Sequence, residues 1–410
     1  MGHVHIMTKP TGSVCNLDCD YCFYLEKEKL YPDNKQFKMN QKVLENYIRQ
    51  NIEAQPNDAE FYNFAWQGGE PTMMGVKFYQ QAIELQKQYA QGKPCHNTFQ
   101  TNGILLNDDW CRFFKQNNFL VGISIDGNES HHDVYRKNRA SRGSHQQVLN
   151  AIKLLQTHKV NFNALVVLHK GNIEQPLELY QYLRSLGIQH IQFTPLLERI
   201  AQEQTKDGLT LVHPDYLGTA NVSPWSVRPL QYAHFLNSLF DYWCQNDIGK
   251  VFINSFETTL GLAIGEPSNS CVFAPTCGNA IVLEHNGDVY SCDHFVYPEH
   301  LLGNIETQTI TSMANSAEQQ RFGADKRDNL AKECLDCRYI SLCNGGCPKH
   351  RFEISKNGMS NKNYFCGDYQ SYYQHVLPHM RDIYNALVKG ETPERLIQHF
   401  RQKFAARSSS

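Results

Sequence analysis

Three cysteines stand close together near the start of the chain, in the stretch CNLDCDYC, as Cys15, Cys19 and Cys22. Structural zinc ions and cubane iron–sulfur clusters usually take four protein ligands, yet this stretch offers no fourth cysteine. Three thiolates would hold three irons of a [4Fe–4S] cluster and leave the fourth iron free to bind a substrate or cofactor. The C-x3-C-x2-C spacing therefore predicts an open cluster, with structural zinc or unligated thiols as the alternative.

Eight further cysteines lie between residues 271 and 366. Their order and spacing are Cys271-x5-Cys277-x14-Cys292, then Cys334-x2-Cys337-x5-Cys343-x3-Cys347, then Cys366. Eight thiolates suffice for two complete [4Fe–4S] clusters, and two zinc sites are the alternative. Because full ligation leaves no iron open to a substrate, such clusters would serve electron transfer.

The composition of the chain limits the other function classes. Its 410 residues are 41% hydrophobic and 20% charged, which is an ordinary globular mixture. The net charge is −2, and no block of Lys and Arg interleaved with aromatic residues occurs, so neither nucleic acid nor an anionic membrane is expected as a partner. No signal peptide and no apolar run of about 20 residues is recognisable. We therefore expect a cytoplasmic protein, in which cysteine-rich segments indicate metal or redox chemistry.

Six short β-rich runs alternate with stretches of helical period in the first half of the chain. The runs span residues 3–9, 61–66, 96–101, 119–125, 160–168 and 188–193. Six β/α units with right-handed crossovers predict a parallel sheet, and six units in place of eight predict a partial (β/α)6 barrel of the α/β class. The cysteine loop, QGGEP, TNG, DG and TPLLER follow strands, and in barrel-like folds these strand ends carry the site.

The chain divides into four expected segments. Residues 1–227 would form the barrel with an irregular connecting loop, residues 228–264 a helical linker, residues 265–372 a cysteine-rich domain, and residues 373–410 a helical tail. The open side of a partial barrel could admit a ligand larger than a metabolite.

The stretch CNLDCDYC resembles the signature of radical S-adenosylmethionine enzymes, in which the methionyl amino and carboxylate groups chelate the open iron. The resemblance implies that the GGE motif of WQGGEP holds the methionyl amino group. It also implies ribose contacts from GISIDG. It further implies that Arg142 contacts the cofactor carboxylate, with Arg136 and Arg139 as alternatives. The implied residues are Gly68, Gly69, Glu70, Ser124, Asp126 and Arg142. Taken alone, GGEP and Asp126 could simply form turns.

The C-x2-C-x5-C-x3-C run resembles the SPASM domain, which carries two auxiliary clusters in radical enzymes that modify peptides. The resemblance implies one cluster on Cys271, Cys277, Cys292 and Cys347. It implies the other on Cys334, Cys337, Cys343 and Cys366. Two-cluster ferredoxins likewise share one ligand run between two clusters.

Over nearly the whole chain, the sequence is similar to anaerobic sulfatase-maturating enzymes. The stretches that carry this similarity are CNLDCDYCFYLEK, AWQGGEPTM, FQTNGILLNDDW, GISIDG and GDVYSCDHFV. The similarity implies three [4Fe–4S] clusters, S-adenosylmethionine, and a flavodoxin- or ferredoxin-like reductant. The implied reaction oxidises one Cys or Ser of a sulfatase, within a C/S-x-P-x-R segment, to Cα-formylglycine. A 5′-deoxyadenosyl radical is needed because no ordinary base removes hydrogen from an unactivated Cβ.

The same similarity implies roles for three further residues. Asp293, directly after Cys292, matches the proposed catalytic base, with a turn residue as the alternative. Tyr24 and Gln67 occupy positions that face the site, although an aromatic side chain beside a cluster is as often packing.

Two other functions compete with this interpretation. A related SPASM enzyme would install a thioether, C–C or cyclophane crosslink in a ribosomal peptide, but such enzymes often carry an N-terminal extension, whereas the first predicted strand here begins almost at once. A non-enzymatic electron-transfer protein would not explain an open cluster beside GGEP. An assay for reductive cleavage of S-adenosylmethionine discriminates between an enzyme and an electron carrier.

Overall fold

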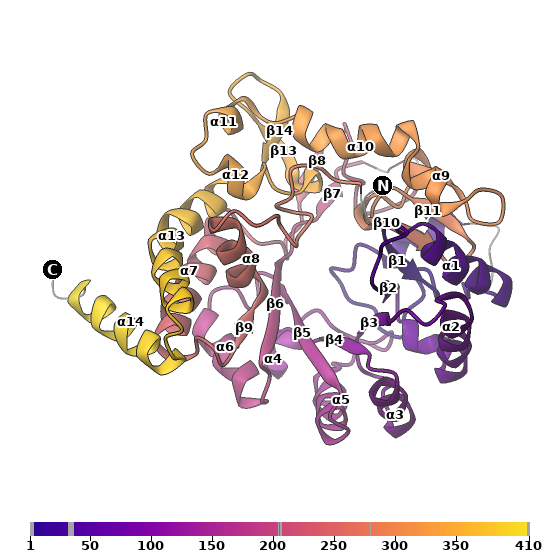
Figure 1. The fold of residues 1–410 in the computed structure, drawn as a ribbon. Coiled ribbons are helices and arrows are strands. Elements are labelled where there is room, and N and C mark those ends of the chain that lie inside the picture. The colour runs from indigo at the N-terminus through magenta and orange to yellow at the C-terminus, as the bar shows by residue number, and fades with distance from the viewer. Residues whose placement is uncertain (1–3, 32–36, 204, 206, 279, 408–410) are drawn as a thin grey trace.

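A curved parallel sheet forms the centre of the computed structural model, which describes residues 4–31, 37–203, 205, 207–278 and 280–407 (Figure 1). The six central strands are β1 (His5–Lys9), β2 (Tyr62–Trp66), β3 (Cys95–Thr101), β4 (Leu120–Ser124), β5 (Asn161–Leu168) and β6 (His190–Pro195). They lie in chain order and pair in parallel. The predicted partial barrel is confirmed, although the first strand was expected from His3, which lies outside the described residues.

Helices cover the outer face of this sheet (Figure 1). They are α1 (Gln41–Glu53), α2 (Val76–Tyr89), α3 (Asp108–Gln116), the short α4 (Glu129–His132), α5 (His145–Thr157) and α6 (Pro176–Ser185). In α3, the Asn107 side chain accepts a hydrogen bond from the Trp110 backbone N–H and so caps the helix. Trp110 and Phe114 then pack on Phe99 of β3, which anchors the helix to the sheet.

Strands from the cysteine-rich region extend the same sheet beyond β1. β10 (Ala280–Glu284) pairs in parallel with β1, from His5 opposite Ala280 to Lys9 opposite Glu284. β11 (Asp288–Tyr290) and β12 (Leu301–Asn304) continue it in antiparallel fashion, and β9 (Phe252–Ile253) adds to β6. The sheet thus crosses the expected boundary at residue 264, because β1 would otherwise present an unpaired edge.

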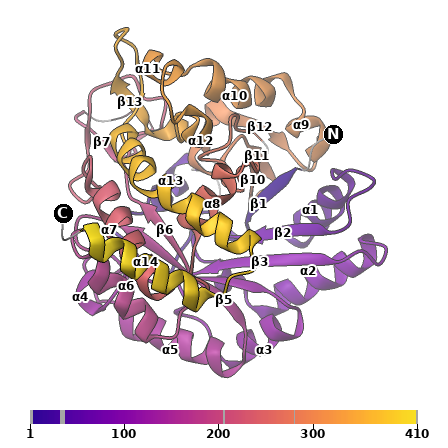
Figure 2. The ribbon, with the colours of Figure 1, turned by 60° about the vertical axis from the view of Figure 1, so that its left-hand side comes forward.

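The segments expected to form the linker and the tail contain several further elements. The irregular segment 196–227 contains the strand pair β7 (Arg199–Ala201) and β8 (Ala220–Val222). The expected linker holds α7 (Gln231–Asn246) and α8 (Asn254–Ala263), separated by β9. α13 (Cys366–Val388) starts at a cysteine before residue 373 and is followed by α14 (Pro393–Arg407). Figure 2 shows α13 and α14 lying over α7.

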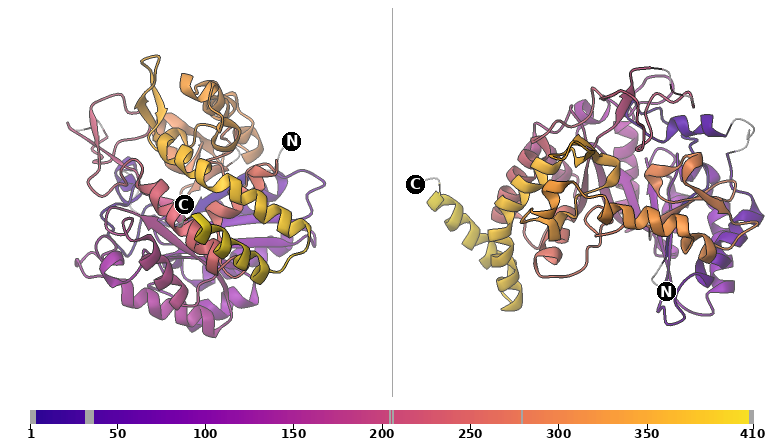
Figure 3. Two further views of the ribbon diagram at one scale, coloured as in Figure 1. Left: turned by 90° about the vertical axis from the view of Figure 1, so that its left-hand side faces the viewer. Right: turned by 90° about the horizontal axis from the view of Figure 1, so that it is seen from above.

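The remaining elements surround the cysteine-rich region. They are α9 (Ile310–Ala314), α10 (Ala317–Asp328), α11 (Lys332–Leu335), α12 (Ile340–Cys343), β13 (Arg351–Ile354) and β14 (Ser360–Asn363), with 3-10 helices at Leu25–Leu30, Pro71–Met74, Asp293–Phe295, Pro298–His300 and Pro348–His350. Figure 3 shows the C-terminal helices at one end of the molecule, away from the N-terminal helices. None of the described helices is long and apolar enough to cross a membrane.

Candidate active site

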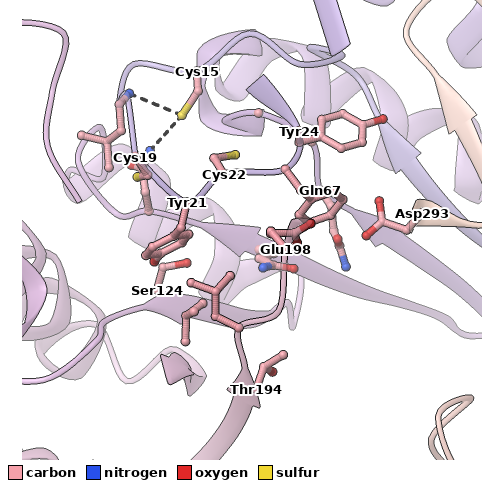
Figure 4. Close-up of a pocket in the computed structure, with 18 of the residues that line it drawn as sticks. Cys15, Cys19, Tyr21, Cys22, Tyr24, Gln67, Ser124, Thr194, Glu198 and Asp293 are labelled. Atoms are coloured by element: carbon pink, nitrogen blue, oxygen red, sulfur yellow. Dashed lines mark hydrogen bonds between the residues drawn. The ribbon is translucent and has the colours of Figure 1, made fainter. Parts of the chain in front are cut away.

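A cavity of about 270 Å³ opens where the strands end. Residues at the ends of five strands line it, namely Lys9 at the end of β1, Gln67 after β2, Thr101 of β3, Ser124 of β4 and Thr194 of β6. The cysteine loop closes one side of this cavity, and a segment of the cysteine-rich region closes another (Figure 4). The cysteine loop, QGGEP, TNG and TPLLER, which were predicted to carry the site, therefore all contribute to one common space, whereas DG does not.

Cys15, Cys19 and Cys22 all line this cavity (Figure 4). The loop is held by a hydrogen bond of 2.9 Å from the Cys22 N–H to the Cys19 carbonyl. Burial, followed by the nearby Glu70 carboxylate, raises the pKa of Cys15 to about 12. Bound iron would supply the positive charge that lets such thiols ionise.

The spacing of these thiols fits a cluster better than a single zinc ion. Within the described ranges, no three His, Cys, Asp or Glu side chains converge closely enough to hold one metal ion. The charges of Cys15, Cys19 and Cys22 nevertheless influence one another's pKa, so the three thiols surround a shared space. Such an arrangement suits the larger [4Fe–4S] cube.

The remaining cysteines gather in two groups. Cys271, Cys277, Cys292 and Cys347 lie near enough for the charge of one to raise the pKa of another. Cys334, Cys337, Cys343 and Cys366 line one small cavity of their own. The two groups coincide with the predicted ligand sets, and the assignment of an auxiliary cluster to each stays a prediction.

Cations lie beside the first of these groups. The Lys326 ammonium donates hydrogen bonds of 2.7 and 2.8 Å to the carbonyls of Cys271 and Val272. Burial lowers the pKa of Lys326 and of Arg351, but the nearby cysteine charges act in the opposite direction. These two side chains would offset part of the negative charge of four thiolates.

The GGE motif packs directly on the cysteine loop. Gly69 donates a backbone hydrogen bond of 2.8 Å to Gly12, and Glu70 donates one of 3.0 Å to Val14. The Glu70 carboxylate is fully buried and accepts hydrogen bonds from Thr101 Oγ1 at 2.7 Å and from the Asn102 N–H at 2.8 Å. Glu70 therefore ties the ends of β2 and β3 together. Gly68, Gly69 and Glu70 all line the cavity, so cofactor contacts from this motif stay a proposal.

Replacing Gly69 by Ala should disrupt the cysteine loop. A Cβ atom at residue 69 would lie 2.0 Å from the Val14 carbonyl oxygen, which is backbone and cannot swing away. We expect a loss of about 1–3 kcal/mol of stability and weaker binding of S-adenosylmethionine. Thermal unfolding and equilibrium binding check this. Gly75→Ala is the control, because its Cβ meets nothing within 4 Å and only its φ of 77° opposes the change. Equal effects of both substitutions would contradict the close contact.

Arg136, and not Arg142, reaches the cavity. The Arg142 side chain is exposed, does not line the cavity and belongs to a turn in which its backbone N–H donates to Asn138 Oδ1 at 3.1 Å. The structure does not support the predicted cofactor contact of Arg142. Arg136 is buried and lines the cavity, so we transfer that proposed contact to it.

Asp126 holds Arg136 in place and does not itself line the cavity. Its carboxylate lies 2.7 Å from Arg136 Nε and accepts hydrogen bonds from the Tyr21 hydroxyl at 2.6 Å and from the Val167 N–H at 2.9 Å. The predicted ribose contact of Asp126 therefore has no support in the geometry. Ser124, at the end of β4, does line the cavity, and its ribose contact stays a proposal.

The Asp126–Arg136 pair should make stability depend on pH in acid. Burial alone would raise the pKa of Asp126, but Arg136 lowers it to about 2, below the ordinary value of about 3.9. The pair therefore stabilises the fold above about pH 4, and this contribution is lost as the pH falls towards 2. Urea unfolding of the metal-free protein measures this contribution. Between about pH 4 and pH 2, the free energy of unfolding should fall by about 2–3 kcal/mol more in wild type than in Asp126→Asn. Parallel pH profiles would contradict the assignment.

Asp293 lies on the side of the cavity shared by Tyr24 and Gln67 (Figure 4). Its carboxylate forms an ion pair with Lys9, and the Lys9 ammonium lies 4.0 Å from the centroid of the Tyr24 ring. The Tyr24 hydroxyl donates to Glu284. Burial acts to raise the pKa of Asp293, but Lys9 outweighs it and the net pKa is lowered. Asp293 is thus ionised at neutral pH and ready to accept a proton.

Besides Lys9, two charged groups of the cavity were not singled out in the sequence. Glu198, from TPLLER after β6, forms an ion pair with Lys349, which follows Cys347 by two residues. The Lys349 ammonium also lies 4.7 Å from the centroid of the Phe23 ring. The pair joins the barrel to the cysteine-rich region across the cavity. The strand-end position of TPLLER signalled Glu198, whereas nothing in the spacing signalled Lys349.

Comparison with known proteins agrees with this site. The Radical SAM superfamily model matches residues 10–183, and the model of the SPASM iron–sulfur cluster-binding domain matches residues 271–338. A serine-type anaerobic sulfatase-maturating enzyme of Bacteroides thetaiotaomicron is 42% identical over 96% of this chain and 94% of its own length. A cysteine-type enzyme of Clostridium novyi is 32% identical over 91% of this chain and 95% of its own length.

A solved structure described as native anSMEcpe with bound AdoMet and Cp18Cys peptide also superimposes on the chain. It has a TM-score of 0.81 at 29% sequence identity and covers 93% of this chain and 99% of its own length. The family models, the full-length relatives and this fold agree. The chain therefore belongs to the anaerobic sulfatase-maturating enzymes of the radical S-adenosylmethionine superfamily.

Proposed function

We propose that this enzyme oxidises a Cys or Ser residue of a sulfatase to Cα-formylglycine. It uses S-adenosylmethionine and three [4Fe–4S] clusters. The observation that carries the proposal is that the three thiols of CNLDCDYC and the ionised carboxylate of Asp293 line one cavity. The reaction requires a radical source and a base, together with an acceptor for one electron. Family membership sets aside the non-enzymatic electron carrier.

Cys15, Cys19 and Cys22 would hold the open cluster, and the cofactor bound there supplies the 5′-deoxyadenosyl radical that takes one hydrogen from the substrate Cβ. Arg136 and Ser124 line the cavity where they would orient the cofactor. Apolar side chains of Leu196 and Leu197 line the same cavity and would keep water from the radical.

Asp293 would act as the general base once the Cβ hydrogen has gone. The substrate radical would then lose one electron, for which the auxiliary cluster proposed beside Cys292 is the outlet, and its hydroxyl or thiol proton becomes acidic. The Asp293 carboxylate would accept that proton, and Lys9 keeps the carboxylate ionised before the transfer. Tyr24 and Gln67 line the same side and would help to place the substrate side chain.

We further propose that serine is accepted as the target residue. Relatives named serine-type are 42% and 36% identical to this chain, whereas relatives named cysteine-type are 32% and 30% identical. A sulfatase segment of the C/S-x-P-x-R type would enter from the open side of the barrel, and the solved relative is described with a bound Cp18Cys peptide.

A flavodoxin- or ferredoxin-like protein is the proposed reductant that starts turnover. A cytoplasmic location is proposed with it, because the cysteines assigned to clusters must stay reduced until iron is bound. For the domains, we propose a barrel at 1–227, a linker at 228–264, a SPASM domain at 265–372 and a tail at 373–410. The sheet crosses the second of these boundaries, and α13 crosses the last.

Anaerobic incubation with both peptide types tests this function. The cluster-loaded enzyme, S-adenosylmethionine and a chemical reductant are mixed with a Ser or a Cys peptide, and a hydrazine reagent then traps any aldehyde for mass spectrometry. Trapping is essential because a crosslink and an aldehyde made from serine both correspond to the loss of two hydrogens. A peptide with Ala at the target position is the control. Loss of two hydrogens without hydrazone formation would indicate a crosslinking enzyme instead.

A further inference from the structure

A second cavity, of about 780 Å³, opens on the surface around Cys337 and Cys366. It is formed by α11, by Lys356 and Lys362 of the β13–β14 region, and by the first turns of α13. In Figure 1, α11 and β14 lie at the side of the molecule opposite α3 and α5. This cavity is separate from the candidate active site, because the residues that line the two cavities are different.

The two cysteines at this surface belong to the group proposed to hold the second auxiliary cluster. The exposed side chain of Gln370 lies over them, with its Nε2 3.6 Å from Cys366 Sγ and 3.9 Å from Cys337 Sγ. One amide side chain therefore lies between these sulfurs and the solvent. A cluster bound here would lie close to the protein surface.

The wall of this cavity is positively charged. Four cations line it, namely Lys332, Arg338, Lys356 and Lys362, against two anions, Glu333 and Asp336. The Glu333 carboxylate is already engaged by the Lys356 backbone N–H at 2.9 Å. The whole chain carries a net charge of −2, so a local excess of positive charge marks this face.

Two exposed apolar side chains lie close in sequence to these cations, within three residues of Lys332 and of Lys356. Leu335 is 69% exposed and lies in α11 between Cys334 and Cys337. Ile354, at the end of β13, is 67% exposed. Apolar side chains beside a charged rim are typical of surfaces that bind another protein.

We propose that the basic basin, defined as Lys332, Arg338, Lys356 and Lys362 around Cys337 and Cys366, is the docking surface of an acidic ferredoxin. Charge complementarity selects an acidic partner, and the proximity of two cluster ligands selects one that carries electrons. The inference rests on the proposed function.

The electron exchanged at this surface follows from the reaction. Removing two hydrogens converts a Ser side chain to the aldehyde and a Cys side chain to a thioaldehyde, which water then hydrolyses to the aldehyde with release of hydrogen sulfide. The first leaves as a hydrogen atom to the deoxyadenosyl radical, and the remaining substrate radical loses one proton to the base and one electron. The oxidised ferredoxin takes up that electron and is reduced by one electron per aldehyde formed. The electron that starts turnover is supplied separately by the reductant.

Binding of an acidic bacterial ferredoxin to the cluster-loaded enzyme tests the docking surface. In anaerobic surface plasmon resonance at low salt, Lys332→Glu/Lys356→Glu should slow association by about tenfold or more, since charges at a rim mainly set the association rate. The difference should disappear near 1 M salt, where the screening length is about 3 Å. The matched control is Lys115→Glu/Lys153→Glu, which reverses two exposed charges on α3 and α5.

A second readout separates this inference from the proposed function. The Lys332→Glu/Lys356→Glu protein is called the basin variant. With dithionite as reductant, it should cleave S-adenosylmethionine as fast as wild type. Equal cleavage shows that the variant folds and loads its clusters. Equal association rates of wild type and the basin variant, equal slowing by the control variant, or salt-independent binding would each overturn the docking surface. If wild type binds ferredoxin as expected but makes no aldehyde from either peptide, the proposed function fails while the docking surface stands.

Discussion

Replacing Cys15, Cys19 and Cys22 together by Ala is expected to abolish cleavage of S-adenosylmethionine. The three thiols are the cysteines that line the cavity, so their loss removes the open cluster while the two other groups of four keep their ligands. Iron should fall from about twelve to about eight atoms per chain, by the four-per-cube stoichiometry. Iron assay and chromatography of 5′-deoxyadenosine are the two measurements.

The matched control for this variant is Cys95→Ala/Cys111→Ala. These cysteines lie on β3 and α3, outside all three groups, and the substitution should leave both iron and cofactor cleavage near wild type. Stoichiometric zinc in the wild-type protein, or unchanged iron in the triple variant, would contradict the assignment of an iron–sulfur cluster to this loop.

Asp293→Asn is expected to uncouple cofactor cleavage from product formation. Hydrogen abstraction comes first and does not need the carboxylate, so 5′-deoxyadenosine should still form. Formylglycine should fall by about 10²–10⁴, the loss typical of a missing general base. Asn is nearly isosteric with Asp, so packing is largely kept. Both products are measured in the same anaerobic reaction, one by chromatography and one by mass spectrometry of the trapped aldehyde.

Glu299→Gln serves as the control for Asp293→Asn, because it neutralises an exposed carboxylate six residues further along the same segment. It should leave both products unchanged. A near-normal aldehyde yield from Asp293→Asn would remove this residue from catalysis. Joint loss of both products with intact iron would assign it to substrate positioning, through its ion pair with Lys9.

The spacing of residue types along the chain was enough to predict the six β/α units and the cysteine loop. A strand repeats its pattern every two residues and a helix about every 3.6, so the six β/α units were readable along the chain. The cysteine loop was also recognisable from the sequence, because all three of its thiols lie within eight residues. Gly69 could be placed in the site from its motif, although only the structure shows that Val14 leaves no room for a side chain.

The side-chain placements that the sequence did not reveal depend on how the chain folds back on itself. Arg136 and Arg142 belong to one loop, and a turn that pairs Lys137 with Gly143 sends one side chain inward and the other to solvent. The buried Asp126 forms an ion pair with Arg136, and the spacing of the two arginines in the sequence does not reveal which of them forms this pair. Likewise, Lys9 meets Asp293 only because β10 aligns with β1 in one register.

The pairing of β1 with β10 also constrains how the protein is made. Residues 5–9 leave the ribosome well before their partners at residues 280–284, which follow only after the six strands of the barrel have been synthesised. Such long-range pairing raises contact order and slows folding, and until it forms the edge of β1 is open to association with other chains. Chaperones that shield nascent chains would therefore act on this protein until residues 280–284 have been synthesised.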